Sequence, residues 1–523
     1  MLVLKVVGYV TQTVRFAHQR LRLMVSLRLP VTQSNRLCYV WGISEIINFS
    51  RHLKDNMVHL FSQIVKLIFA GERDMEIIKP RILKGTRDFM PHQMIYRDFV
   101  ISKLKAVFEK YGYEPLATPA IEYFDVLSGK YGEEVEMLLY RLVYRDGKTI
   151  ALRYDLTVPL SRVVAMNPDI VKPIFKRYQI QPVWRAEKPQ KGRYREFTQC
   201  DVDAVGSNSI LVDAEIIAII NEMMVNLGFQ NFEIKINNRK ILDGITEYAG
   251  VSDSNKIVCR CIDKLEKIGV EGVKSELEEN AIPSDAIDKI FTILDITGDI
   301  GSGKSEVGSR KLNTIEGKLT ESKKALQGID ELRQINDALK CLGVPDDNYS
   351  FDLCLARGLD YYTGPIFEVV VKEAGIGSVV GGGRWDTLIG QFTGKDTPAV
   401  GTSFGLERLI DAMEMLSLLP PIQTKIQALV APFNRDLTMQ ALAYVSQLRA
   451  ADINAEIYFE PDSMRDTMGY ANRKVIPIVV IVAPDELAEG KVAIRNMQTK
   501  QQEKVEIVNF VNRVREMLVD LQK

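Results

Sequence analysis

Apolar residues recur at helical spacing near residue 100 of the chain. Ile95, Phe99, Leu104 and Phe108 repeat at roughly the interval that places side chains on one helix face. Gly112 follows and ends the pattern, since glycine commonly terminates helices. The pattern therefore predicts a helix over about 92–110, followed by an extended segment.

Strand-like alternation begins beyond this helix. Asp146 and Gly147 separate two alternating runs, a combination typical of a hairpin turn. Alternation also marks the runs IFKRYQIQPVWRAE and REFTQCDVDAVG, which predict two antiparallel strands joined by a loop with Gly192 at its turn. Residues 207–228 then predict another helix.

The pattern changes several times along the chain and so suggests its domain organisation. The stretch after residue 244 is helical, polar and rich in lysine, and strand-like runs return only after about residue 346. A helical insertion therefore interrupts one domain. The last hundred residues alternate between strand-like and helical runs, which predicts a compact α/β module with some parallel pairing. The predicted segments are an atypical N-terminal extension (1–74), the first part of the split domain (75–243), the helical insertion (244–345), the second part (346–418) and the C-terminal module (425–523).

The N-terminal extension is apolar and basic. It carries nine Lys and Arg residues up to Lys66 against two acids, Glu45 and Asp55. This composition resembles a transit peptide, although an amphipathic repeat and a cleavage pattern are missing. A second hypothesis is a wrongly chosen start codon, because GERDM, which ends at Met75, can be encoded by a purine-rich run resembling a bacterial ribosome-binding site. We expect the natural protein to begin at Met75, which the intact mass of protein from the native host would test.

Composition narrows the class of protein. The chain has 523 residues, a net charge of −1, 46% hydrophobic and 26% charged residues, as in ordinary soluble globular proteins. Its six cysteines are scattered without a CxxC pair, which argues against a disulfide framework or a cysteine zinc site and favours a cytoplasmic setting. No uncharged apolar run reaches about 18 residues, so no membrane span is predicted. The near-neutral charge still allows a nucleic-acid partner, which needs only a local basic patch.

One nucleotide-binding motif is misleading. GDIGSGKS, residues 298–305, matches the pattern G-x-x-x-x-G-K-S, whose loop must follow a buried strand. The preceding run, AIDKIFTILDI, has helical spacing instead. We therefore interpret residues 298–305 as a surface turn of the insertion.

A second phosphate-binding candidate is the stretch RAEKPQKGRYREF. Residues 185–197 hold five basic side chains in thirteen positions, on the loop between the two predicted strands. Such a loop is either a solvated surface turn or a phosphate-binding loop. Arginine suits the second role because its planar guanidinium group binds phosphate bidentately.

Three stretches of the split domain, read together, resemble class II aminoacyl-tRNA synthetases: Arg185 to Asp203, LARGLDYYTG at 355–364 and GTSFGLERL at 401–409. LARGLDYYTG is similar to the histidyl-tRNA synthetase family in particular, as are RYDLTVP, KGTRDFMP and GGGRWD elsewhere in the chain. The resemblance covers about residues 80–523. It implies an α+β catalytic domain with an antiparallel sheet flanked by helices, a helical insertion and a C-terminal α/β anticodon-binding domain.

The resemblance also implies the reaction and the ATP site. Histidine is activated with ATP to histidyl-adenylate, and is then esterified to histidine tRNA. Arg185 would hold the α-phosphate, and Arg408 would clamp the γ-phosphate from the opposite side. Arg357 would bridge the histidine carboxylate and the α-phosphate, which makes Arg185 and Arg357 the implied catalytic residues. ATP contacts are implied for Arg185, Glu187 (through adenine), Arg195 (outer phosphates), Phe197 (stacking on adenine) and Arg408, with Mg²⁺ offsetting charge and no protein ligand assigned to it.

For histidine, the resemblance implies a polar pocket. Arg185 and Arg357 would contact the substrate as well as ATP. The α-amino contacts would be Asp155, Thr157 and Gln199, and the imidazole contacts Asp203, Tyr361 and Tyr362. Gln199 and Asp203 are four apart in a predicted strand and so share a face. The motif GGGRWD departs from the family, which more often carries tyrosine where Trp385 stands, so a hydroxyl contact at that position is in doubt.

The implied partners are L-histidine, ATP, histidine tRNA and a second copy of the chain, without a membrane. The segment 92–122 resembles the dimer-forming first motif of the class. Three alternatives stay open: a catalytically silent paralogue that regulates histidine biosynthesis, another class II synthetase (prolyl, threonyl or glycyl), and a non-enzymatic RNA-binding protein with a synthetase-like body. The silent paralogue would be expected to lose the arginines and the C-terminal module, both of which are present.

Overall fold

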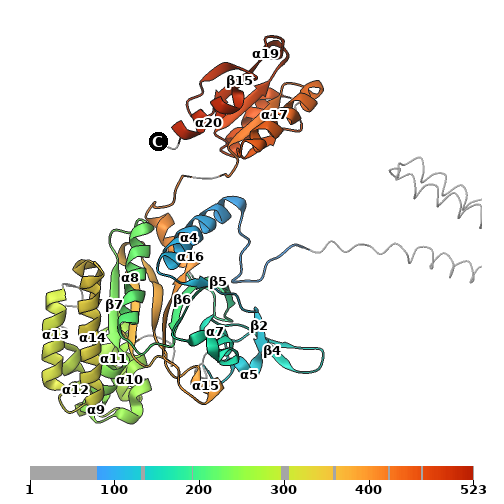
Figure 1. Cartoon of the computed structure of the whole chain (residues 1–523). Helices are drawn as coiled ribbons and strands as arrows, with labels where there is room; N and C mark the ends of the chain where they lie inside the picture. The colour runs from blue at the N-terminus through green and yellow to red at the C-terminus, as the bar shows by residue number, and fades with distance from the viewer. Residues whose placement is uncertain are drawn as a thin grey trace, which may run out of the picture. The chain divides into compact units, whose positions relative to one another are not determined.

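The computed structural model describes residues 79–130, 136–190, 192–295, 305–356, 361–421, 424–460 and 463–521 (Figure 1). Three features of the sequence lie outside these residues. They are the N-terminal extension with its expected start at Met75, the predicted catalytic residue Arg357, and nearly all of the motif at 298–305.

The centre of the split domain is a sheet of eight strands in the order β1-β5-β6-β11-β10-β9-β7-β8. Every pairing from β5 to β7 in this order is antiparallel, and only the outer strands β1 and β8 pair in parallel. The predicted antiparallel sheet and the strand-loop-strand around Gly192 are confirmed. The strands are β1 (Glu114–Pro115), β5 (Phe175–Trp184), β6 (Glu196–Val205), β7 (Glu233–Asn238), β8 (Tyr349–Phe351), β9 (Pro365–Val371), β10 (Ile376–Arg384) and β11 (Ala399–Gly405).

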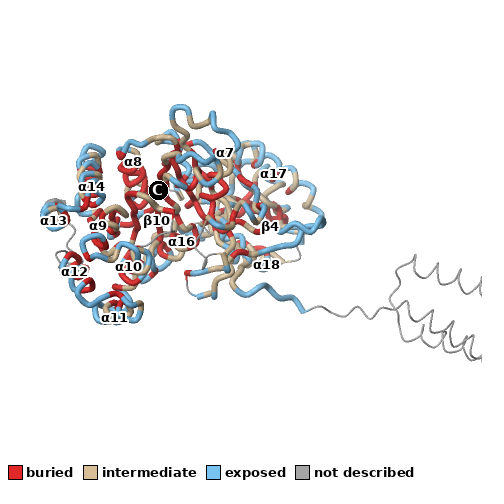
Figure 2. The backbone as a smooth tube through the Cα atoms, turned by 90° about the horizontal axis from the view of Figure 1, so that it is seen from below, coloured by how far each residue is buried: buried red, intermediate tan, exposed pale blue. Residues whose placement is uncertain are grey.

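Helices α8 (Leu211–Asn226) and α16 (Leu406–Met415) pack against this sheet, and α4 (Pro91–Lys110) packs against both of these helices. Phe108 of α4 lies with its ring 5.6 Å from that of Tyr178 on β5 and 5.8 Å from that of Phe404 on β11. Figure 2 shows the buried segments concentrated around α8 and β10. The helices predicted over 92–110 and 207–228 are thus confirmed, and their apolar faces build the core.

Among the described residues, six α-helices follow β7 before the chain returns to the sheet at β8 (Figure 1). Because β7 and β8 are parallel neighbours, the helices leave and rejoin the sheet at one edge. Helix α12 directly precedes the motif at 298–305, so the prediction that a helix rather than a strand comes before it is confirmed. The division of the chain at 244 and 345 stays a prediction. The helices are α9 (Arg239–Ala249), α10 (Asn255–Ile262), α11 (Leu265–Glu279), α12 (Ser284–Asp295), α13 (Ser305–Lys318) and α14 (Lys323–Cys341).

A smaller sheet, in the order β2-β4-β3, carries the hairpin predicted at Asp146 and Gly147. Gly147 has a φ of 82°, a left-handed conformation that glycine adopts without strain. The sheet is built from β2 (Ile121–Tyr123), β3 (Arg141–Val143) and β4 (Thr149–Leu152), with helices α5 (Phe124–Leu127), α7 (Thr157–Met166) and α15 (Gly390–Thr393) next in the chain or packed nearby.

The C-terminal module has its own five-stranded sheet and its own apolar core. Strand β12 pairs in parallel with β13 and β14, and β14, β15 and β16 pair antiparallel, which confirms the predicted α/β module with some parallel pairing. Across the described part of the chain, none of the helices combines the length and apolarity that a bilayer crossing requires. The module comprises β12 (Ala428–Pro432), α17 (Thr438–Ala450), β13 (Ala455–Ile457), α18 (Met464–Arg473), β14 (Ile478–Val482), α19 (Pro484–Ala488), β15 (Lys491–Asn496), β16 (Gln502–Glu506) and α20 (Phe510–Asp520).

Candidate active site

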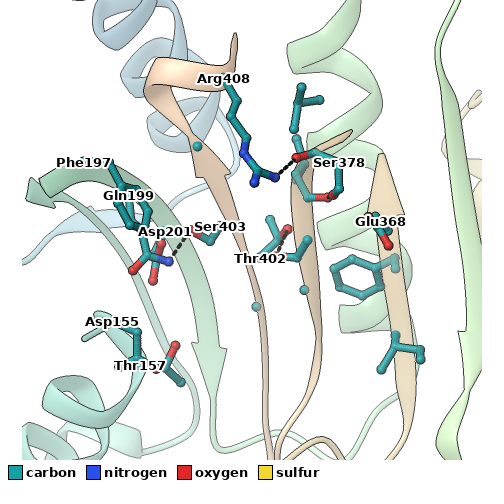
Figure 3. A pocket seen from close by; sticks show the side chains of 18 of the residues that line it. Asp155, Thr157, Phe197, Gln199, Asp201, Glu368, Ser378, Thr402, Ser403 and Arg408 are labelled. Carbon is teal, nitrogen blue, oxygen red and sulfur yellow. Dashed lines mark hydrogen bonds between the residues drawn. The ribbon is translucent and has the colours of Figure 1, made fainter. Parts of the chain in front are cut away.

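A cavity of about 390 Å³ opens on one face of the large sheet. Its floor is formed by β6, β11, β10 and β9, and its rim by the loop after β5 and the first turns of α7 and α16. Figure 3 shows Arg408 and Ser378 near one end, and Asp155 and Thr157 near the other. The cavity therefore has a cationic end and an acidic end.

Strand β6 supplies the acidic part of the floor. Its alternation directs Gln199, Asp201 and Asp203 to the cavity, while Cys200 and Val202 are buried in the apolar core on the opposite face. The structure thus brings Gln199 and Asp203 together as predicted. It adds Asp201, which the sequence analysis missed although the same two-residue alternation would have identified it.

Asp203 is buried beside a buried cation. Its Oδ2 lies 2.8 Å from the Arg177 guanidinium of β5, which stands opposite it in the sheet. Burial raises the pKa of Asp203 to about 6, and the Arg177 charge limits that rise. Asp203 therefore titrates close to neutral pH.

Asp201 has no such partner across the sheet. It stands opposite Gln179 on β5 and Ser403 on β11, both neutral. Burial raises its pKa to about 8, the nearby Arg177 opposes the rise, and the Asp203 charge adds to it. A proton thus resides on Asp201 at neutral pH in this geometry.

Glycine makes room for the Asp203 carboxylate. A Cβ atom added at Gly401 would lie 2.0 Å from Asp203 Oδ1, and one added at Gly382 would lie 2.3 Å from the Gly401 carbonyl oxygen. Real side chains essentially never approach so closely. The bare backbone of β10 and β11 is therefore part of the floor's shape.

The acidic end is completed by residues from two other segments. Asp155 accepts a hydrogen bond from the Val158 amide at 3.1 Å, which fixes it at the start of α7. The Tyr361 hydroxyl donates to Asp155 Oδ2 at 3.5 Å, and the rings of Tyr361 and Tyr362 meet edge to face at 5.1 Å. Burial raises the pKa of both tyrosines, so both keep their hydroxyl proton. The predicted set Asp155, Thr157, Tyr361 and Tyr362 lines one wall of the cavity.

Aromatic rings and backbone carbonyls hold Arg185 and Arg408 at the cavity wall. The Arg185 guanidinium lies over the Tyr154 ring at 4.2 Å and the Phe197 ring at 5.0 Å. Arg408 donates from Nε to the Gly192 carbonyl at 2.9 Å and from Nη1 to the Ser378 carbonyl at 2.5 Å (Figure 3). These contacts fix both guanidinium groups at the cavity wall.

The other charged residues of the loop that carries Arg185 do not all face the cavity. Glu187 and Arg193 both line the cavity, 3.7 Å apart. Arg195 does not line it, because its guanidinium donates to the carbonyls of Glu187 at 3.1 Å and Lys84 at 3.2 Å. The structure thus places Arg193, rather than the predicted Arg195, at the cavity. Both lie in the basic stretch, and only the fold of the loop distinguishes them.

Trp385 forms part of the wall beside Asp203. Its side chain is fully buried, its amide donates to the Ala399 carbonyl at 2.7 Å, and a hydrogen bond from its side chain lowers the pKa of Asp203. The indole therefore replaces the tyrosine hydroxyl, which is more common in this motif, with a donor directed at a carboxylate.

Two expected components of the site, Arg357 and a bound Mg²⁺ ion, are not located by the residues that line the cavity. Arg357 lies outside the described residues, directly after Ala356 and before Tyr361. Within the described ranges, no group of three or more His, Cys, Asp or Glu side chains is arranged to hold a metal ion.

Comparison with known proteins gives a consistent result. Residues 85–409 match the family model described as histidyl-tRNA synthetase, and residues 427–517 match that described as anticodon binding domain. A histidine–tRNA ligase of Gloeobacter violaceus is 44% identical over 453 residues, 80% of this chain and 95% of that protein. One of Aeropyrum pernix is 43% identical over 419 residues, 79% and 92% respectively. The crystal structure of a histidyl-tRNA synthetase from Nostoc superimposes with a TM-score of 0.74 at 32% identity, covering 84% of this chain and all of that one.

Proposed function

We infer the function from the fact that this chain belongs to the histidyl-tRNA synthetase family. It is a histidine–tRNA ligase, and we propose that the cavity holds ATP at its cationic end and histidine at its acidic end. The observation that carries this assignment is that one cavity is lined both by the guanidinium groups of Arg185, Arg193 and Arg408 and by the carboxyl groups of Asp155, Asp201 and Asp203.

Activation of an amino acid requires a carboxylate to attack the α-phosphorus of ATP. Two anions must approach each other, so positioning and electrostatic stabilisation dominate the catalysis. Arg185 would bind the α-phosphate from its place over Phe197, whose ring would stack on adenine. Arg357 would bridge the histidine carboxylate and the α-phosphate, where charge develops, and its loss should cost on the order of 10²–10³ in rate.

The outer phosphates would lie toward Arg408 and Arg193. Arg408 is fixed by two carbonyls and so offers a guanidinium in a defined place without reorganisation. Glu187 would fix the adenine from the same loop. Arg195 reaches only backbone carbonyls in this structure, so an outer-phosphate role for it requires the loop to rearrange when ATP binds.

Mg²⁺ would accompany ATP. Magnesium is commonly held by one or two carboxylates together with substrate phosphates, so a cluster of three protein ligands is not required. Glu368 lines the cavity and would supply such a carboxylate. When bound, the ion would neutralise part of the developing phosphate charge.

Histidine would fill the acidic end. Its ammonium group would be accepted by Asp155, Thr157 and Gln199, and its ring would face Asp203, Tyr361 and Tyr362. Such a pocket can reject other amino acids by roughly 10⁴, because a ligand without matching donors leaves buried polar groups unpaired.

We also propose a homodimer. The segment that resembles the dimer-forming motif includes α4, β1 and β2, and exposed apolar side chains lie on β2 and on or directly after β3 of the small sheet, namely Ile121, Tyr123, Leu142, Val143 and Tyr144. Contiguous exposed apolar side chains commonly mark protein interfaces. If the chain forms a homodimer, light scattering of the protein in solution should give twice the mass of one chain. The C-terminal module would bind the anticodon of histidine tRNA, and the scattered cysteines favour the cytoplasm.

ATP–pyrophosphate exchange with each of the twenty amino acids in turn tests the function. We expect exchange with histidine alone. Exchange with proline or threonine but not with histidine would overturn the substrate assignment, and no exchange with any amino acid would favour the silent paralogue.

A further inference from the structure

Three consecutive cavity-facing side chains of β6 carry buried oxygen atoms that accept no hydrogen bond from the described part of the chain, although one of these atoms, Asp203 Oδ2, is ion-paired with Arg177. Gln199 Oε1, Asp201 Oδ1 and Asp203 Oδ2 are all buried and lack a hydrogen-bond partner within the described residues. A buried acceptor left unpaired costs about 1–3 kcal/mol. Three such atoms in one cavity therefore indicate a ligand that brings several donors.

The substrate proposed above supplies donors of this kind. Its ammonium group has three N–H bonds, and its ring offers one N–H when neutral and two when protonated. Gln199 is already expected at the ammonium group, which leaves the two carboxyl groups for the ring. Asp203 satisfies only one ring nitrogen, and of the two tyrosines expected at the ring, Tyr361 already donates its hydroxyl proton to Asp155.

The spacing of the two carboxyl groups suits a ring held between them. Residues i and i+2 of a strand lie about 6.6 Å apart. Two hydrogen bonds of about 2.8 Å with an imidazole between their ends span a similar distance. Asp201 and Asp203 are also 98% and 97% buried, so both carboxyl groups are shielded from bulk solvent.

Asp201 and Asp203 differ in the charge of their neighbours. Asp203 has the Arg177 guanidinium at 2.8 Å, whereas the cross-strand neighbours of Asp201 are neutral. The Ser403 hydroxyl hydrogen-bonds to Asp201 but carries no charge. An ionised Asp201 thus has no cation opposite it in the sheet. The Arg177 charge offsets only part of the effect of burial, which raises the pKa of Asp201 to about 8.

We propose that Asp201 contacts the imidazole ring of the substrate and shares one proton with a ring nitrogen, while Asp203 contacts the other nitrogen. Either the carboxylic acid donates to the neutral ring, or the carboxylate accepts from the imidazolium, so atoms and charge are the same in both descriptions. The inference rests on histidine being the substrate. It makes Asp201 a specificity-determining residue in addition to the predicted set.

Two variants test it, Asp201→Asn, which keeps the shape of the side chain, and Asp201→Ala, which opens space. The measurements are the KM values for histidine and ATP in pyrophosphate exchange. We expect the histidine KM to rise roughly 10- to 100-fold in Asp201→Ala, as for a lost hydrogen bond to a charged group. The rise should be smaller in Asp201→Asn, and the ATP KM should stay within about twofold.

Ring-methylated histidines provide the second readout. In the parent enzyme, a methyl group on the nitrogen that faces Asp201 should abolish competition with histidine, and in Asp201→Ala that discrimination should fall by roughly tenfold or more. A purely structural role for Asp201 would not change it. Equal increases in both KM values, or unchanged discrimination, would overturn the inference. A parent enzyme that exchanges with another amino acid instead would show that the substrate assignment itself is wrong.

Discussion

Arg177 and Asp203 form an ion pair at 2.8 Å on neighbouring strands, and neither side chain is reached by solvent to more than 4%. The pair lacks the alignment of a full hydrogen bond, because Asp203 Oδ2 and Arg177 Nε have no hydrogen-bond partner among the described residues. Removing two charges from water is costly, and only part of that cost is returned by their attraction. The pair is therefore better understood as preparing Asp203 for a ligand than as stabilising the fold.

Replacing Arg177 by methionine tests this relationship. The change leaves a buried carboxylate without its cation, so the free energy of unfolding should fall by about 3–5 kcal/mol at pH 8. Adding Asp203→Asn should recover much of the loss, because no uncompensated charge remains. Urea unfolding of the single and double variants measures both values. Equal stability of the two variants would show that the ion pair does not couple them.

Asp201 should make stability depend on pH. Because burial raises its pKa from 3.8 to about 8, the folded protein retains a proton between these pH values that the unfolded chain releases. This residue therefore lowers the free energy of unfolding as pH rises from about 4 to about 8, by at most about 1.4 kcal/mol per pH unit.

Asp201→Asn cannot ionise and removes that contribution. We expect the variant to become increasingly more stable than the parent between pH 5 and pH 8 in urea unfolding. Asp347→Asn, at an exposed position, serves as the control. A stability difference that does not change with pH would contradict the assignment of a raised pKa to Asp201.

The sequence predicted much of the fold because its patterns are local. Alternation identified β5 and β6, and helical spacing identified α4 and α12, since each depends on residues close in the chain. The site residues of β6 also followed from alternation, once resemblance had indicated where to look. Asp201 was missed because family motifs name individual positions, whereas the strand exposes a whole face.

The different positions of the Arg193 and Arg195 side chains, one at the cavity and one away from it, were not predictable in this way. Both are basic and separated by one residue, and the loop between the strands has no periodic pattern. Arg195 turns away because the Gly85 carbonyl accepts its amide at 2.8 Å, and the Lys84 carbonyl accepts its guanidinium. That contact joins segments more than a hundred residues apart, which no local pattern encodes.

Two adjacent glycines of β10 should differ sharply in tolerance. A Cβ at Gly382 would lie 2.3 Å from the Gly401 carbonyl oxygen and 2.6 Å from Phe367 Cε2, whereas one at Gly381 would meet nothing within 4 Å. Gly382→Ala should therefore lower the free energy of unfolding by about 1–3 kcal/mol, as overpacking does. Gly381→Ala, the matched control, should change it by less than about 0.5 kcal/mol. Thermal and urea unfolding of both variants measure these changes, and equal losses of stability in the two variants would contradict the prediction.

Trp385 should influence histidine binding through Asp203. Trp385→Phe removes the donor that lowers the pKa of Asp203, so that pKa should rise. If ionised Asp203 binds the ring, the acidic limb of kcat/KM for histidine should move to higher pH, and the histidine KM should increase roughly tenfold. Trp385→Tyr restores a hydroxyl and should lie between parent and Trp385→Phe. An unshifted pH profile in Trp385→Phe would contradict the proposed coupling.

Arg408 and Arg195 offer a matched pair for the ATP site. Arg408 lines the cavity, whereas Arg195 does not and donates its guanidinium protons to the carbonyls of Glu187 and Lys84. Arg408→Ala should raise the ATP KM roughly 10- to 100-fold, the effect of losing a charged hydrogen bond to phosphate. If the loop keeps this conformation when ATP binds, Arg195→Ala should change the ATP KM far less and should mainly lower thermal stability. Comparable increases in both variants would show instead that ATP binding turns Arg195 into the cavity, as the family resemblance implies.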